Sequence, residues 1–111
     1  MTPAEIAQRQ LDAYNAQDLD RFCAFFAEDV VVADYGGGET LRGMAAYRER
    51  YATLFATHPQ NHVTLLGRIA IGNTVIDHEE VRRTPDAAPF HVAAIYTIAD
   101  GKIARVDFVR P

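Results

Sequence analysis

Two short turns in the second half of the chain constrain its fold most. Gly72-Asn73 and Asp100-Gly101 each separate two long segments that are rich in β-branched and aromatic residues. Such dipeptides favour two-residue hairpin loops, because the loop needs a positive φ that glycine adopts without a steric clash. The sequence therefore predicts two β-hairpins, with strands at about residues 60–71, 74–84, 90–99 and 102–109.

The residues before the hairpins predict three helices and one strand. The first helix, from Pro3 to about residue 16, follows a capping-box pattern formed by Thr2 and Glu5. A short apolar helix is expected to end near residue 27, and a third helix is expected at 44–57. Valines at 30–32 predict a strand, and a further short strand at 40–41 is left open. The resulting order, ααβαββββ, predicts an α+β protein whose antiparallel sheet is covered by three N-terminal helices.

Length and composition exclude several classes of protein. The 111 residues fit a single domain spanning 1–111. Cys23 is the only cysteine, which fits a reducing cytoplasm, and we expect no membrane span because no apolar run reaches about 20 residues. A net charge of −4 without a basic cluster disfavours nucleic acid. No phosphate-binding glycine loop or metal-ligand spacing is present in the sequence, so we expect neither cofactor nor metal.

The predicted hairpin loops also predict which side chains face the helices. In the first hairpin, a two-residue loop places Arg68 opposite Asp77 and Gly67 opposite His78. The row that contains Ile69, Ile71 and Ile76 is the more apolar one, so we expect it to pack under the helices with His78 pointing inward. Arg68 and Asp77 are then expected to form an outward ion pair. A β-bulge would instead bring Asp77 and Glu79 inward.

Several stretches of sequence resemble one superfamily. These are the segments YNAQDLD at 14–20, FAEDV at 26–30 and LRG at 41–43, together with the order of elements. They resemble the nuclear-transport-factor-2-like superfamily, and within it the SnoaL-like polyketide cyclase and ketosteroid-isomerase-related group. This resemblance implies a cone-like, cystatin-like α+β roll with an apolar pocket between sheet and helices. Many members are homodimers through the outer sheet face, which here is expected to present Val92, Ala94, Tyr96, Ile98, Ile103 and Val109.

The resemblance also implies candidate catalytic residues. In ketosteroid isomerases, an aspartate at the end of the first strand moves a proton beside a carbonyl group, and its position corresponds to Asp34. The tyrosine of the oxyanion hole corresponds to Gln10 and the acid to about Ala93, so neither is matched. Tyr14, one helical turn after Gln10, and His78 are the replacement donors that we expect.

These arguments lead to two alternative functions. The first is an isomerase or cyclase that transfers a proton on a small hydrophobic carbonyl compound, with Asp34, His78 and Tyr14 as catalytic residues. The second is a non-catalytic ligand-binding or dimerisation module of the same fold. In both cases the residues expected to bind the ligand are Gln10, Tyr47, Tyr51, Phe55, His91, Phe108 and Arg110.

Overall fold

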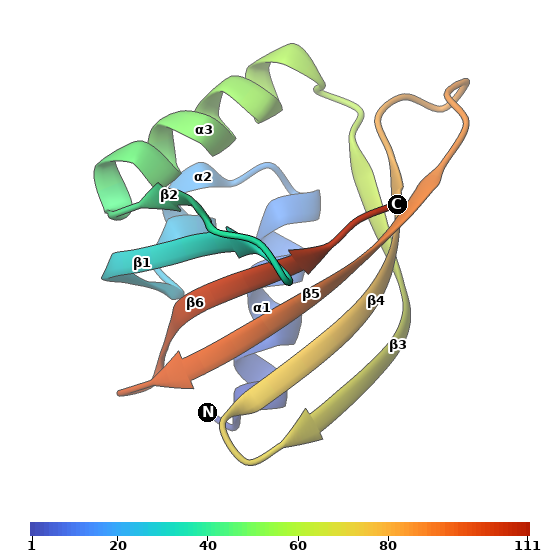
Figure 1. Ribbon diagram of the computed structural model, residues 1–111. Helices are drawn as coiled ribbons and strands as arrows, with labels where there is room; N and C mark the ends of the chain where they lie inside the picture. Colours follow the sequence, from blue (N-terminus) through green and yellow to red (C-terminus); the bar gives the residue numbers. More distant parts are fainter.

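The computed structural model describes all 111 residues, and its elements follow the predicted order (Figure 1). They are α1 (Pro3–Asn15), α2 (Leu19–Cys23), β1 (Phe26–Asp34), β2 (Glu39–Arg42), α3 (Met44–Thr57), β3 (His62–Ile71), β4 (Thr74–Arg82), β5 (Phe90–Ala99) and β6 (Lys102–Val109). The short strand left open by the sequence is therefore present as β2. None of the helices is long and apolar enough to span a membrane.

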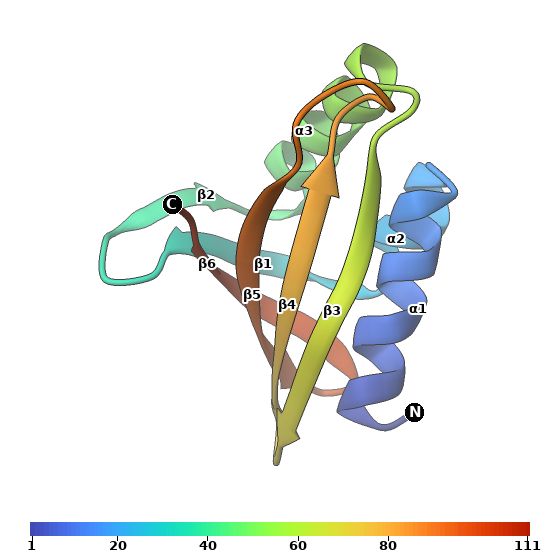
Figure 2. The same ribbon diagram turned by 90° about the vertical axis from the view of Figure 1, so that its right-hand side faces the viewer.

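The six strands form one sheet in the order β2-β1-β6-β5-β4-β3. Every neighbouring pair is antiparallel except β1 and β6, which are parallel. The sheet is strongly curved, and the helices lie on its inner side (Figures 1 and 2). This arrangement confirms the predicted α+β roll, apart from the one parallel pair.

Specific hydrogen bonds fix the ends of α1. The Thr2 hydroxyl accepts a hydrogen bond from the Glu5 backbone N–H at 3.1 Å, and the Glu5 carboxylate accepts one from the Thr2 backbone N–H at 3.2 Å. This reciprocal pair is the predicted capping box. At the other end, the Asn15 side chain bonds both the N–H and the carbonyl of Val63, each at 2.9 Å. The last turn of α1 is thereby attached to the edge strand β3.

The second helix is shorter than predicted. It ends at Cys23, and β1 already begins at Phe26, which pairs with Ile103 of β6. Phe26 is buried against Phe22, with ring centroids 4.9 Å apart, and against Tyr47, with centroids 4.6 Å apart. Aromatic packing and pairing with β6 thus extend the strand into a segment whose local sequence favours a helix.

Both hairpin turns are confirmed. Gly72 alone has a positive φ of 56° in the first loop, whereas Asp100 and Gly101 have φ values of 52° and 76° in the second. These patterns are those of type II′ and type I′ turns respectively. The pairs next to the first loop are as predicted, with Arg68 opposite Asp77.

The prediction for the inner face of the first hairpin was wrong. The β3–β4 register shifts between Leu65 and Gly67, so one extra residue changes the alternation along β3. Val63 is therefore buried, whereas Ile69 is 56% exposed. Asp77 and Glu79 point inward and His78 is exposed, which is the arrangement expected from a bulge.

The second hairpin also contains a bulge, in β6, and the β5 face that was predicted to lie outside is the inner one. The β5–β6 register shifts between Thr97 and Ile98, so Thr97 pairs with Arg105 and Ala94 with Phe108. Of the residues expected on the outer face, Val109 alone is exposed. The buried ones are Val92, Ala94, Tyr96, Ile98 and Ile103.

Candidate functional site

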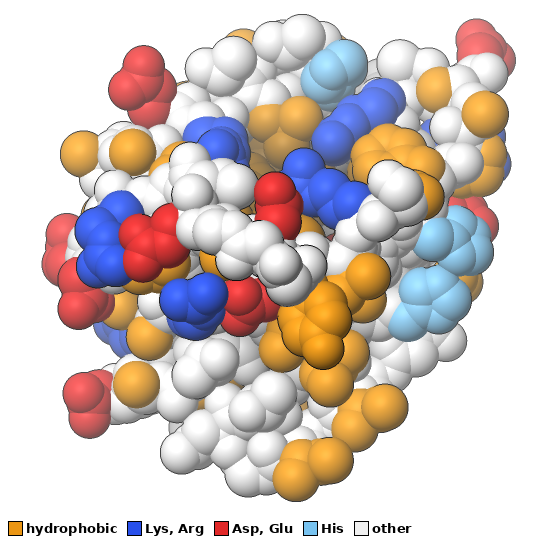
Figure 3. Space-filling model, viewed as in Figure 1, with side chains coloured by type: hydrophobic (Ala, Val, Ile, Leu, Met, Phe, Trp, Pro, Cys, Tyr) orange, Lys and Arg blue, Asp and Glu red, His pale blue; other side chains and the backbone are white.

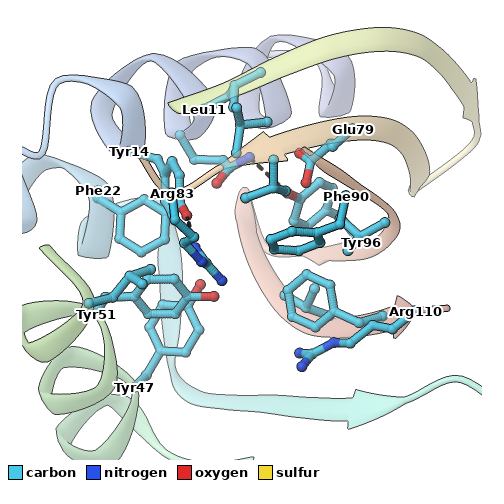
Figure 4. Close-up of a pocket in the computed structure, with 17 residues that line it drawn as sticks. Leu11, Tyr14, Phe22, Tyr47, Tyr51, Glu79, Arg83, Phe90, Tyr96 and Arg110 are labelled. Atoms are coloured by element: carbon cyan, nitrogen blue, oxygen red, sulfur yellow. Dashed lines mark hydrogen bonds between the residues drawn. The ribbon is translucent and has the colours of Figure 1, made fainter. Parts of the chain in front are cut away.

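A cavity lies between the helices and the concave face of the sheet (Figure 4). Its volume is about 140 Å³, and 13 of its 17 lining residues are hydrophobic. The lining residues are Gln10, Leu11, Tyr14, Phe22, Tyr47, Tyr51, Leu54, Val63, Glu79, Val81, Arg83, Phe90, Val92, Tyr96, Val106, Phe108 and Arg110. Such a composition suits an apolar ligand that is oriented by a few polar groups.

Aromatic side chains from three helices form one wall of the cavity. The Phe22 ring lies 5.7 Å from Tyr14 and 4.8 Å from Tyr51, between ring centroids. Tyr47 is buried behind Tyr51, with centroids 4.7 Å apart, and burial raises the pKa of Tyr51 to about 12. Phe55 contacts Tyr14 at 5.5 Å but does not line the cavity. Of this wall, Tyr14, Tyr47 and Tyr51 were expected at the site from the sequence, Phe22 was not, and the expected Phe55 lies behind it.

Glu79 supplies the only carboxyl group in the cavity lining. Its side chain lies on the inner face of β4, is 6% exposed and has no hydrogen-bond partner within the protein. The pKa of Glu79 is raised to about 8, mainly by burial and also by the charge of Asp77, while Arg68 acts in the opposite direction. Glu79 is therefore largely a neutral carboxylic acid at pH 7 and a carboxylate above pH 8.

A neighbouring ion pair explains why Glu79 has no cation of its own. Arg68 donates two hydrogen bonds to the carboxylate of the fully buried Asp77, at 2.7 and 2.9 Å. A third donor of Arg68 bonds Gln8 Oε1 of α1 at 2.9 Å. The charge of Arg68 is thus already balanced by Asp77, and Glu79 remains unpaired two residues along the same strand.

Two tyrosine hydroxyls of the cavity are oriented by amide side chains. Gln10 Nε2 donates to Tyr96 Oη at 3.0 Å, and Asn61 Nδ2 donates to Tyr14 Oη at 2.6 Å. Each hydroxyl oxygen therefore accepts a hydrogen bond and keeps its own proton for another acceptor. Burial raises the pKa of both tyrosines, so both hydroxyls stay protonated and can donate to a ligand.

Asp34 does not line this cavity. It is exposed at the end of β1 and lies in a second, open hollow of about 570 Å³. This hollow also contains Arg50, Arg83 and Arg110, and the last two line the cavity as well. Asp34 therefore lies in the open hollow next to the cavity and not in the cavity itself.

The structure places the two predicted histidines away from the cavity. His78 and His91 are exposed on the outer face of the sheet, with His78 Nε2 3.0 Å from His91 Nδ1. His91 Nε2 lies 3.7 Å from Glu80 Oε2. The expectation that His78 points into the pocket was wrong. The alternation of β4 is regular, but the bulge in β3 puts Val63 and Ile69 on opposite faces, so the row of Ile69 and Ile76 lies outside together with His78. No group of three His, Cys, Asp or Glu side chains is arranged to hold a metal ion.

Sequence comparison identifies the family. The sequence pattern of the SnoaL-like domain matches residues 7–106. The chain belongs to the SnoaL-like family.

Solved structures resemble this SnoaL-like protein over almost its whole length. An uncharacterised cystatin-fold protein from Novosphingobium aromaticivorans is 34% identical, with a TM-score of 0.91 and 99% of each chain covered. A putative ketosteroid isomerase from Kribbella flavida is 20% identical, with a TM-score of 0.82 and coverage of 98% of this chain and 77% of that one. A putative polyketide cyclase from Sinorhizobium meliloti is 24% identical, with a TM-score of 0.77 and coverage of 97% and 99%. The last two likenesses show the nuclear-transport-factor-2-like fold.

Sequence reasoning missed Arg83 and Tyr96 of this SnoaL-like site, and it had Glu79 only as the alternative that a β-bulge would produce. A signal for Glu79 was present in the alternation of β4, where Val75 and Val81 flank Asp77 and Glu79 at a spacing of two residues. Side chains at this spacing share one face of a strand. The two valines are both buried, and the acids between them lie on the same face.

Proposed function

We propose that this SnoaL-like protein is an isomerase- or cyclase-type enzyme that transfers a proton next to the carbonyl group of a hydrophobic compound. The observation that carries the proposal is the unpaired carboxyl group of Glu79 in a largely apolar cavity. A general acid–base catalyst works best when its pKa lies near the working pH, and the pKa of Glu79 is about 8. The family relatives named isomerase and cyclase are consistent with this chemistry.

In the proposed reaction, the ionised Glu79 removes a proton from the carbon next to the carbonyl. The electron pair of the broken C–H bond moves to the carbonyl oxygen and forms an enolate. The hydroxyl of Tyr96 or Tyr14 donates a hydrogen bond to this oxygen, which stabilises the developing charge. The protonated Glu79 then returns the proton to the same or another carbon atom, so the enzyme is regenerated without net uptake of protons.

A neutral bicyclic ketone tests the proton transfer directly. We suggest incubating the protein with α-tetralone in D₂O and following loss of the proton signals next to the carbonyl by NMR. Wild type should accelerate this exchange, and Glu79→Gln should slow it by about 100-fold or more, since glutamine cannot accept the proton. Unchanged exchange in Glu79→Gln would show that Glu79 is not the base.

Two further variants make the experiment specific. Glu80→Gln changes the neighbouring carboxyl group, which lies on the outer face of β4 beside His91, and should leave the exchange rate unchanged. Asp34→Asn tests the aspartate that the family resemblance indicates. A large loss in Asp34→Asn alone would assign the base to Asp34 instead. Ketone binding without any exchange by wild type would support the non-catalytic binding module.

A further inference from the structure

Three arginines line the open hollow next to the cavity. Arg50 lies on α3, Arg83 directly after β4 and Arg110 directly after β6, and all three line the open hollow of about 570 Å³. Figure 3 shows basic side chains gathered around a hollow on this face of the molecule. The three arginines come from parts of the chain that are distant in sequence. The fold, and not a local run of charged residues, therefore brings them together.

None of these three arginines forms an ion pair within the protein. The arginines that form ion pairs with acidic side chains are Arg42, Arg48, Arg68 and Arg105. The single acid in the hollow is Asp34, so three positive charges face one negative charge. Because the whole chain carries a net charge of −4, this local excess of positive charge is opposite in sign to the rest of the protein.

Two of the arginines are held in place by neutral groups. Arg83 donates a hydrogen bond to Asn61 Oδ1 at 2.9 Å, and its guanidinium lies 5.2 Å from the centre of the Phe90 ring. The Arg110 guanidinium lies 4.8 Å from the centre of the Phe108 ring. Contact with an aromatic face orients a guanidinium without neutralising it, and leaves N–H groups at its edge for an anion. Figure 4 shows both side chains among the residues that line the cavity.

The hollow adjoins the cavity. Tyr51, Leu54, Arg83 and Arg110 line both of them. A single molecule can therefore place an apolar part against the aromatic wall while a polar end reaches the arginines. Planar guanidinium groups suit carboxylate and phosphate oxygens, because their paired N–H donors match the geometry of these anions.

We propose that Arg50, Arg83 and Arg110 bind an anionic oxygen group, a carboxylate or a phosphate, on a ligand whose apolar part occupies the cavity. The substrate class is then an amphipathic acid rather than a neutral steroid-like compound. That the substrate carries a carbonyl group is inferred from the proposed function. That it carries an anionic group is inferred from the three arginines alone.

The inference is tested by calorimetric titration with 4-oxo-4-phenylbutanoic acid and with its methyl ester. The two compounds share the aromatic ketone and differ in the charged end. Wild type should bind the acid about tenfold more tightly than the ester or better, because a hydrogen bond to a charged group contributes more than one to a neutral group. Added sodium chloride should weaken binding of the acid and leave the ester nearly unaffected.

The double variant Arg50→Gln/Arg110→Gln removes two of the charges at exposed positions and retains the Arg83 contacts within the core. It should lose the preference for the acid, with the ratio of acid affinity to ester affinity falling to about one. Arg9→Gln removes one charge from the exposed face of α1, outside both the cavity and the hollow. This variant should still bind the acid more tightly than the ester. Thermal unfolding of each variant confirms that it is folded.

The outcomes separate this inference from the proposed function. An acid that binds no better than the ester, or a preference that survives in the double variant, would overturn the anion site. Exchange of the α-tetralone protons would still test Glu79 in that case, because that probe carries no charge. Conversely, a preference for the acid without any proton exchange would retain the anion site and reject the enzyme. A phosphonate with the same aromatic ketone shows whether a carboxylate or a phosphonate is preferred. Tighter binding of either anion than of the methyl ester supports the inference.

Discussion

Glu79 has an unusual electrostatic position for a glutamate. It lies in an apolar cavity, with Asp77 beside it on β4, Arg68 on β3 and the Tyr96 hydroxyl on β5. Arg68 is bound to Asp77, so the negative form of Glu79 is stabilised only weakly. The same arrangement that raises the pKa of Glu79 to about 8 makes its ionised form unfavourable in the folded protein.

Stability should therefore depend on pH through Glu79. The folded protein keeps a proton on this group up to about pH 8, whereas the unfolded chain releases it near the ordinary pKa of 4.5. Because the folded state binds more protons between these values, the free energy of unfolding should fall as pH rises, by at most about 1.4 kcal/mol per pH unit from this group. Urea denaturation at pH 5, 6, 7 and 8 measures this slope.

The matched variant Glu79→Gln isolates this contribution. Glutamine does not titrate, so the fall in stability from pH 5 to pH 8 should be smaller in the variant than in wild type. The difference between the two curves should level off above about pH 9, where Glu79 is ionised in both states. Parallel curves for the two proteins would contradict the raised pKa of Glu79.

The rate of proton exchange should follow the same ionisation. If the carboxylate of Glu79 is the base, exchange of α-tetralone protons by wild type should rise with pH and reach a plateau above the pKa of about 8. The hydroxide-catalysed background, measured without protein, rises without a plateau and is subtracted. A rate that already reaches its plateau near pH 5 would indicate a carboxylate with an ordinary pKa, such as an exposed aspartate.

At the level of secondary structure, one side chain fixes the last turn of α1 to β3. Asn15 satisfies both backbone groups of Val63 on the edge strand. We expect Asn15→Ala to lower the free energy of unfolding by about 1–3 kcal/mol, because these backbone groups lose their partners. Asp12→Ala, at an exposed position one turn earlier in α1, should have a much smaller effect in the same urea titration.

Asn15→Asp distinguishes the two hydrogen bonds. A carboxylate still accepts from the Val63 N–H but cannot donate to its carbonyl. Its second oxygen faces the Val63 carbonyl oxygen, and its charge lies at the C-terminal end of α1, so the loss of stability should be at least as large as in Asn15→Ala. An aspartate variant as stable as wild type would show that the hydrogen bond to the Val63 carbonyl does not help to hold α1 to β3.

The elements were predictable from the sequence, but the faces of the strands were not. Turn residues and capping residues act locally, so the hairpins at Gly72 and Asp100 and the start of α1 at Thr2 were predicted correctly. A bulge adds one residue without a distinctive local signal, and each bulge reverses the alternation beyond it. The bulge in β3 puts Val63 and Ile69 on opposite faces, so a prediction that kept both on one face chose the wrong row and placed His78 inside instead of Glu79.

At the scale of the molecule, the outer face of the sheet carries an apolar row. Ile69, Ile76 and Ile95 are paired across three adjacent strands, and Ile69 is 56% exposed. We propose that this row, rather than the residues expected from the sequence, forms the centre of a homodimer. Light scattering at micromolar concentration should give twice the chain mass of 12.3 kDa.

A charge on the row tests this arrangement. Ile76→Lys should convert the dimer to a monomer, because a buried lysine without a partner is unfavourable at an interface. Ala45→Lys places the same side chain at an exposed position on α3 and should remain dimeric. A wild-type protein that is monomeric at these concentrations would contradict the proposed interface.

The parallel pairing of β1 with β6 has a consequence for synthesis on the ribosome. β1 ends at Asp34, but the strand beside it begins only at Lys102. The backbone edge of β1 that faces away from β2 therefore has no partner strand until the last strand emerges. Pairing between distant segments is slow and leaves strand edges open to other chains. Nascent chains stalled before β6 should thus be the species that most needs a chaperone.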